Sequence, residues 1–213
     1  MVVTSYNLNV FVNCPFDDSY LPLMEALIFA IHDCGFIARS ALEAEDSSEV
    51  RIDKIARIIK DCRYGIHDIS RTEPGTATGL PRFNMPLELG LFLGARRFGS
   101  KFDKTKACLI LDSELYRYQR FCSDIAGQDI QSHESNPGDA IRAVRNWLRN
   151  NSDITGISIP GGSAMIERFN LFQEELPLLC SALRLERSEL IFNDYTMLIA
   201  EWLKANSWWD GDA

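Results

Sequence analysis

The sequence predicts an α/β protein with a doubly wound, mainly parallel sheet and a mainly helical extension at its carboxyl end. In the amino-terminal half, short β-branched and apolar runs alternate with helix-like segments, and this alternation favours right-handed crossovers between parallel strands. After Asp112 the pattern becomes helical. Of the 213 residues, 46% are hydrophobic and 24% are charged, which is the balance of a globular protein.

The strands of the first half are predicted at residues 8–13, 36–42, 63–69 and 106–111. Between them lie three amphipathic helices. We expect Ser19 to cap the first and Gly35 to end it, and Asp46 with Glu49 to form a capping box for the second. The third helix is expected within residues 83–99, after a polar loop at 70–82.

The second half is expected to hold helices at residues 116–125, 137–150, 162–185 and 188–206, with a short strand near 156–159. The predicted division is therefore a core at residues 1–112 and an extension at 113–213 that packs on it. Trp202 is expected to pack on its own chain, whereas Trp208 and Trp209 could equally be core or interface aromatics.

Charge and cysteine usage exclude several classes of protein. A net charge of −8 disfavours broad nucleic-acid binding, which needs Lys and Arg to neutralise phosphates. The one basic cluster, residues 97–106, is expected to be a solvated loop, with a small basic pocket as the alternative. No apolar run approaches the roughly 20 residues of a membrane helix. No leader opens the chain, and six scattered cysteines suggest a reducing compartment, so we expect a cytoplasmic protein without a metal site.

Ligands of open parallel sheets bind beyond the carboxyl ends of the strands, so the residues that follow each strand are the candidates for a site. They are residues 13–18, residues 39–43, the group Asp68, Ser70 and Arg71, and residues 84–88. Structural alternatives remain open for several of them. Residues 17–18 could be turn or capping residues, and Asp68 could bind a loop backbone.

The three histidines give weaker signals. His32 and His67 have apolar neighbours and are expected to be core or edge histidines rather than catalytic groups. His133 lies in a polar segment, and its role stays open.

Glu88 is the sharpest candidate, because it lies among the apolar residues of FNMPLELGLFLGARRFG. If Met85 is the N-cap, Glu88 is at N3, where the helix dipole stabilises it by ~0.3–1 kcal/mol. If Asn84 is the N-cap, Glu88 begins the body of an apolar helix, where burying an unpaired charge is costly. The second case predicts that the Glu88 carboxyl group has a function at a cleft. Gly90 and Gly94 are expected to permit close packing rather than ligand contact.

Four segments carry a resemblance to a known superfamily: VFVNCPFDDSY (10–20), VRIDKIARIIKDCRYGIHDIS (50–70), NMPLELGLFLGA (84–95) and ACLIL (107–111). Their order and spacing resemble the TIR-like and nucleoside 2-deoxyribosyltransferase-like superfamily of bacterial flavodoxin-like domains. The resemblance covers residues 8–111, about half of the chain. Walker A and GxGxxG sequences are absent, which argues against an NTPase or a Rossmann dehydrogenase.

The resemblance implies a glutamate, here Glu88, that acts at the anomeric carbon of NAD or of a related nucleotide or nucleoside. Such an enzyme would be an N-glycosidase, either a hydrolase or a ribosyl transferase, with a role in antiphage defence, no separate cofactor, and a homo-oligomer or a defence protein as partner. The residues expected to bind the substrate are Asn13, Phe16, Asp17, Arg39, Asp68, Ser70, Arg71 and Asn84. The alternative is a non-catalytic module that senses a nucleotide or assembles through TIR-like contacts.

Overall fold

The computed structural model describes residues 5–72, 79–80, 82–153 and 159–208. At its centre is a sheet of five parallel strands in the order β2-β1-β3-β4-β5. The strands are β1 (Asn9–Asn13), β2 (Ile37–Arg39), β3 (Tyr64–Asp68), β4 (Ala107–Asp112) and β5 (Ile130–Ser132). This is the strand order of flavodoxin-like folds, so the predicted fold class is confirmed.

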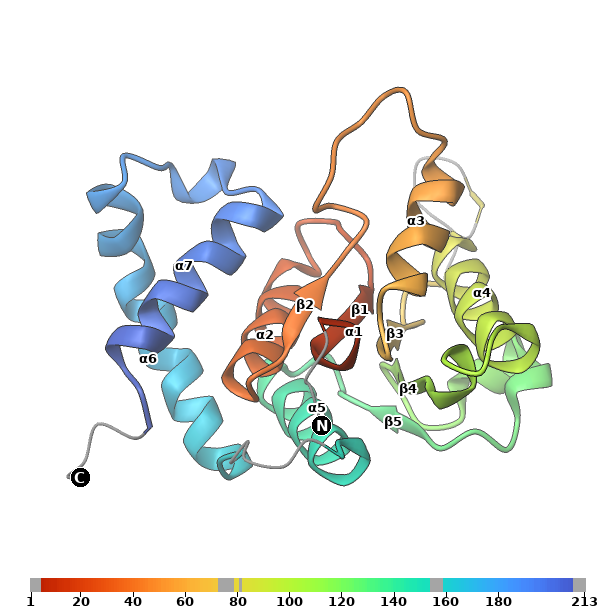
Figure 1. The fold of residues 1–213 in the computed structure, drawn as a ribbon. Coiled ribbons are helices and arrows are strands. Elements are labelled where there is room, and N and C mark those ends of the chain that lie inside the picture. Colours follow the sequence, from red (N-terminus) through yellow and green to blue (C-terminus); the bar gives the residue numbers. More distant parts are fainter. Residues whose placement is uncertain (1–4, 73–78, 81, 154–158, 209–213) are drawn as a thin grey trace.

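Helices cover both faces of the sheet (Figure 1). After the short α1 (Ser5–Leu8), side chains alternate along β1: Val10 and Val12 pack with α2 (Leu21–Asp33) and α5 (Pro137–Asn151), whereas Phe11 packs with α3 (Arg51–Lys60) and Phe92 of α4 (Asn84–Phe98). A further cluster joins Met85 and Leu89 of α4 to β4. Because all five strands are parallel, their carboxyl ends lie at the same edge of the sheet.

The carboxyl-terminal helices α6 (Gly162–Ala182) and α7 (Phe192–Ala205) pack on α2 rather than on the sheet (Figure 1). Phe29 of α2 contacts the rings of Phe169, Phe172 and Trp202. The prediction for Trp202 is confirmed, since its side chain is buried. The indole of Trp208 lies over a guanidinium of α6, 4.4 Å from its carbon, and Trp209 lies outside the described residues.

The second half differs from the prediction at two places. Residues 116–125 form two 3-10 turns, Arg117–Arg120 and Ser123–Ile125, instead of one helix. They lead into β5, an unpredicted strand that pairs with β4 and is too short to show a two-residue period. The division after residue 112 thus falls between two neighbouring strands of one sheet. Most of the strand predicted at 156–159 lies outside the described residues.

Two predicted helix caps are wrong. The residue before α2 is Tyr20, and the Ser19 hydroxyl donates instead to Asp17. The N-cap of α3 is Val50, and the proposed capping acid Asp46 accepts from the backbone and hydroxyl of a nearby serine. In both loops a serine and an aspartate bond each other, and this local bonding competes with capping.

One cation of the basic cluster is buried rather than solvated. Lys106 is 1% exposed, and its ammonium donates to the carbonyls of Ile59 (2.8 Å) and Cys62 (2.5 Å) at the end of α3. A cation at the negative end of a helix dipole satisfies carbonyls that lack helical partners. In the part of the chain that the structure describes, no helix has the length and apolar character to cross a membrane.

Candidate functional site at the carboxyl edge

Three predicted acids lie close enough to Cys14, the residue that follows β1, to act on its thiol through their charges. Burial raises the pKa of the Cys14 thiol well above its usual value, and the charges of Asp68, Glu88 and Asp17 raise it further. These carboxyl groups come from the end of β3, from α4 and from the loop before α2. The carboxyl edge therefore brings together the acids that the sequence placed there, and Cys14 is a neutral thiol among them.

Asp68 is buried, and each of its carboxyl oxygens accepts a hydrogen bond from a neighbour. Its Oδ2 accepts from the hydroxyl of Tyr20 (2.5 Å) and its Oδ1 accepts from the backbone of Ser70 (2.8 Å). His133 Nε2 lies 2.8 Å from Asp68 Oδ2, off the line of an ideal hydrogen bond. The backbone N–H of Ser135 donates to His133 Nδ1 (3.0 Å), which assigns the ring proton to Nε2, facing the carboxylate.

A small hollow of about 270 Å³ opens beside this network, and we call it the carboxyl-edge hollow. It lies where β3, β4 and β5 lead into their loops and where α2 and α5 begin. Its polar lining residues are Ser19, Tyr20, Ser70, Arg71, Ser113 and Ser135. The Arg71 guanidinium donates to the Ser19 hydroxyl (2.8 Å), and Arg71 is exposed. The hollow therefore offers hydroxyls and one cation to a ligand.

A second buried acid lies at the end of β4. Burial raises the pKa of Asp112, although a hydrogen bond and the charge of Arg117 oppose this. Arg117 donates to Asp112 Oδ1 (2.7 Å), to the hydroxyl of Thr72 and to the carbonyl of Ile69. This guanidinium ties the loop after β3 to the loop after β4, which fixes one side of the hollow.

Glu88 differs from these acids, because no described residue donates a hydrogen bond or forms an ion pair with its carboxyl group. Glu88 is 6% exposed, and burial raises its pKa to about 7, while the charge of Arg51 has a lesser, opposing effect. The residue before α4 is Phe83, so neither Met85 nor Asn84 is the N-cap and Glu88 is the fifth residue of the helix. The dipole-capping explanation is therefore wrong, since its effect is confined to the first turn.

Asn13 fixes the start of α4 at this edge. Its side-chain amide donates to the carbonyl of Met85 (2.8 Å) and lies 3.0 Å from His67 Nδ1. His67 is fully buried against Phe92, and burial lowers its pKa to about 3. The prediction that His67 is a core histidine is confirmed. The amide of Asn13 is bonded to the start of α4 rather than free to bind a ligand.

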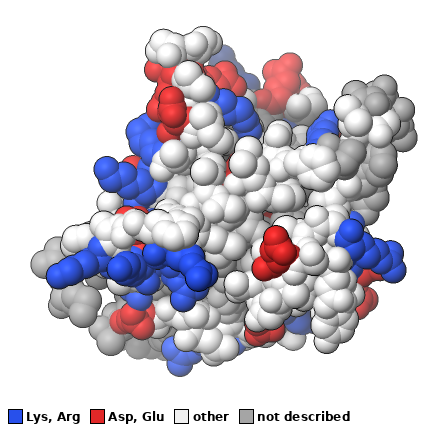
Figure 2. All heavy atoms as spheres, turned by 90° about the vertical axis from the view of Figure 1, so that its right-hand side faces the viewer, with Lys and Arg blue, Asp and Glu red and all other residues white. Residues whose placement is uncertain are grey.

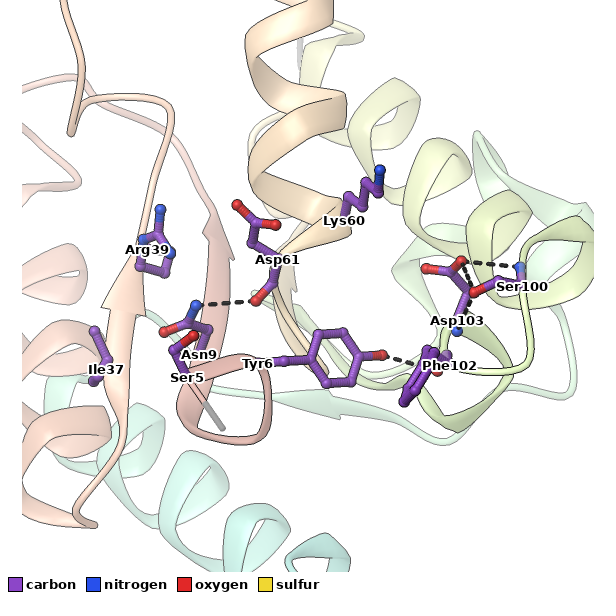
Figure 3. A pocket seen from close by; sticks show the side chains of 10 residues that line it. All are labelled: Ser5, Tyr6, Asn9, Ile37, Arg39, Lys60, Asp61, Ser100, Phe102 and Asp103. Carbon is purple, nitrogen blue, oxygen red and sulfur yellow. Dashed lines mark hydrogen bonds between the residues drawn. The ribbon is translucent and has the colours of Figure 1, made fainter. Parts of the chain in front are cut away.

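Arg39 points away from the other predicted residues. It ends β2, but in the sheet it pairs with Phe11, short of the end of β1. Its guanidinium binds Glu43 through two hydrogen bonds, of 2.7 and 2.5 Å. Arg39 also lines a cavity of about 730 Å³ at the amino edge of the sheet, which we call the amino-edge cavity. Figure 3 shows this cavity with Asn9 at the start of β1 and with Lys60 and Asp61 at the end of α3.

The remaining predicted residues lie on the surface of the rim. Phe16 is 40% exposed, and Asn84 is exposed as the first residue of α4. The hydrogen bond from Ser19 lowers the pKa of Asp17, and the charge of Arg71 lowers it further. Asp17 is thus a charged loop residue beside the hollow, which keeps both its turn role and a binding role open.

Sequence reasoning did not select Tyr20, Ser113 or His133. The short β5 hides that His133 follows a strand, which is the signal that would have selected it. Tyr20 resembles an ordinary core aromatic in the sequence, and only the fold brings its hydroxyl to Asp68. Glu134 and Ser135 both have positive φ (48° and 57°), so the turn after His133 is held in a conformation that non-glycine residues rarely adopt.

No family model, no curated protein and no solved structure matched this chain in the three comparisons. Among the described residues, no group of three or more His, Cys, Asp or Glu side chains is arranged to hold a metal ion. The geometry of the carboxyl edge is therefore the basis on which a function can be proposed.

Proposed function

We propose that the chain is an N-glycosidase-type enzyme that cleaves the N-glycosidic bond of NAD or of a related nucleotide or nucleoside. The observation that carries the proposal is Glu88, a residue only 6% exposed whose carboxyl group has no described partner, at the carboxyl edge of a doubly wound sheet, where such sheets bind ligands. A buried, unpaired acid is unfavourable for stability, and such groups are concentrated at functional sites.

The chemistry of the reaction suits such a group. Cleavage of a bond between ribose and a base builds positive charge on the sugar ring, which a carboxylate can stabilise or attack. With a pKa of about 7, Glu88 populates both its acid and its carboxylate form near neutral pH. The acid can protonate a neutral leaving base. The cationic nicotinamide ring of NAD would instead lower the pKa of Glu88 and favour the carboxylate.

The carboxyl-edge hollow supports a sugar- or phosphate-bearing substrate. Serine hydroxyls donate and accept hydrogen bonds, and Arg71 supplies a guanidinium suited to a phosphate. Because both oxygens of Asp68 already accept hydrogen bonds, we assign Asp68 the role of orienting Tyr20 rather than that of a direct ribose ligand. Tyr20 lines the hollow and keeps its oxygen as an acceptor.

The test is base release from a panel of NAD, nucleoside 5′-monophosphates and nucleosides, followed by liquid chromatography. We expect the wild type to release the base from at least one member and Glu88→Gln to lose this activity while staying folded. An intact panel, with the protein tested over a wide range of concentrations, would reject the proposal. The substrate that reacts also identifies the base.

A second candidate is a non-catalytic module that binds a nucleotide or assembles with other copies. The engagement of both Asp68 oxygens favours it, because an acid held by donors of the protein can orient a ligand pocket without turnover. Leu87, beside Glu88 in the sequence, is 56% exposed and adds an apolar surface near the rim. A nucleotide that raises the melting temperature and stays intact supports this candidate, since ligand bound only to the native state stabilises it.

A further inference from the structure

A second hollow, of about 460 Å³, lies at the other end of α4, and we call it the basic hollow. Its lining comes from the last turns of α4, from the 3-10 turn Asp103–Thr105 and from the segment before β5. The residues are Leu93, Arg96, Arg97, Lys104, Asp124, Ile125 and Gln128. It includes three cations of an otherwise acidic protein, and the function proposed above does not use it.

The basic hollow is separate from the Glu88 site. Arg96 follows Glu88 by eight residues on the same helix, which corresponds to roughly 12 Å along the axis. β4 and β5 begin close to the residues that line the hollow, at Ala107 and Ile130, so it belongs to the amino edge of the sheet. Binding at one site can therefore be measured while the other is disabled.

The three cations lack ionic partners among the described residues. The side chains of Arg96, Arg97 and Lys104 take part in no hydrogen bond or salt bridge with any of them, and all three residues are exposed. The dipole of α4 places only about −0.5 charge at its carboxyl end. Asp124, the one acid in the lining, leaves a net positive charge there.

This local charge opposes the charge of the whole chain. The protein has a net charge of −8, yet Lys and Arg side chains gather in a band beside a largely uncharged area on the face seen in Figure 2. A concave, positively charged patch concentrates anions by focusing the electrostatic field. Three exposed cations around one hollow, without ionic partners among the described residues, leave their N–H groups available to an anionic ligand.

We propose that the basic hollow binds a phosphate-bearing small molecule of the nucleoside diphosphate class. Arg96, Arg97 and Lys104 would hold the phosphates, and Leu93 with Ile125 would provide apolar surface for the rest of the molecule. Pockets for small ligands measure roughly 300–1,000 Å³, and this hollow is within that range. A nucleic acid fits less well, because its phosphates need a long basic stripe on a protein that repels them overall.

Calorimetric titration of the full chain with ADP, tripolyphosphate and adenosine tests this proposal. A variant with R96Q, R97Q and K104Q removes the three cations. A matched variant with R142Q, R149Q and K204Q removes three exposed cations from α5 and α7, so the net charge changes equally. Glu88→Gln removes the proposed catalytic group and leaves the lining of the basic hollow unchanged.

We expect ADP to bind more tightly than adenosine, and we expect the first triple variant to weaken this binding about tenfold or more. The matched variant and Glu88→Gln should keep it within about twofold. Equal loss in both triple variants, or no binding of ADP and tripolyphosphate to the wild type, overturns the proposal. The proposal is also overturned if a single-stranded DNA oligomer binds more tightly than ADP and only the first triple variant loses this binding. The ligand would then be a nucleic acid rather than a small molecule.

Discussion

The two edges of the sheet use buried polar groups in different ways. At the amino edge, such groups close the ends of elements: the amide of Asn9 donates to the carbonyl of Asp61 (2.9 Å), and Lys106 donates to two carbonyls at the end of α3. At the carboxyl edge, Asp68 and its partners form a network beside a hollow, and Glu88 is buried without a described partner. The larger cavity lies at the amino edge, so cavity size alone does not mark the site where the chemistry is proposed.

The same contrast predicts how each edge responds to substitution. Removing a group that satisfies backbone carbonyls should destabilise the protein, whereas removing an unpaired buried acid should stabilise it. At a functional site, removal of the active group is expected to stabilise the protein, since such groups are often maintained at the expense of stability.

The largest expected effect on stability is at the amino edge, for Lys106→Met. The substitution leaves the carbonyls of Ile59 and Cys62 buried without this donor, so we expect the free energy of unfolding to fall by about 3 kcal/mol. Denaturant unfolding measures it. Lys60→Met, at an exposed residue of α3, is the control and should lower the free energy of unfolding by under about 0.5 kcal/mol. Equal losses in the two variants would contradict the capping role of Lys106.

Glu88→Gln should change stability in the opposite direction and in a pH-dependent way. The pKa of Glu88 in the folded protein, about 7, is above the ordinary value of 4.5 for a glutamate, so the folded state disfavours the charged form. Below about pH 4.5 the carboxyl group is neutral in both states, and its cost is absent. As pH rises through 7, the charged group lowers stability by up to about 3 kcal/mol, at ~1.36 kcal/mol per pKa unit.

The glutamine variant avoids this cost, so it should melt above the wild type at pH 8 and close to it at pH 5. Thermal unfolding at both pH values gives the comparison, with the exposed Glu174→Gln as the control that should show no such divergence. A difference between Glu88→Gln and the wild type that stays constant with pH would show that Glu88 is not a buried, strained acid.

Tyr20→Phe should have a smaller effect on stability. It removes the hydroxyl that donates to Asp68 and leaves the ring, so we expect a loss of about 1 kcal/mol in unfolding free energy. If Tyr20 also contacts substrate in the hollow, kcat/KM should fall about tenfold. Tyr64→Phe, whose hydroxyl makes a longer contact of 3.4 Å away from the hollow, should leave kcat/KM unchanged. A similar fall for both would remove Tyr20 from the site.

The smallest stability effect is expected for Ser70→Ala. The Ser70 hydroxyl lines the carboxyl-edge hollow and makes no side-chain hydrogen bond to a described residue, so the melting temperature should stay near that of the wild type. KM should rise if the hydroxyl contacts the substrate. An unchanged KM would place the sugar or phosphate outside the hollow.

The sequence was sufficient to predict the sheet up to β4 and the position of Glu88 at its carboxyl edge, because long apolar periods and strand ends depend on local pattern. It did not predict β5, whose three residues owe their conformation to pairing with β4. The caps were misassigned because serine and aspartate also bond within their own loops, as Ser19 and Asp17 do.

The sequence also did not predict the directions in which side chains point. Arg39 follows a predicted strand, but its register beside Phe11 and its pairing with Glu43 direct it to the amino-edge cavity. The contact of Tyr20 with Asp68 joins residues 48 positions apart, which no local pattern encodes. Such long-range pairs decide which rim residues belong to one site.

Base release from the reactive nucleotide by wild type, Glu88→Gln and Asp61→Asn tests the central claim most directly, because it compares one acid from each edge in the same assay. Asp61 lines the amino-edge cavity and serves as the matched loss of a carboxylate. We predict that Glu88→Gln lowers kcat by a factor of about 10² or more, as expected when an electrostatic stabiliser of the transition state is removed, and that Asp61→Asn stays near the wild type. Equal rates for the wild type and Glu88→Gln would contradict the account.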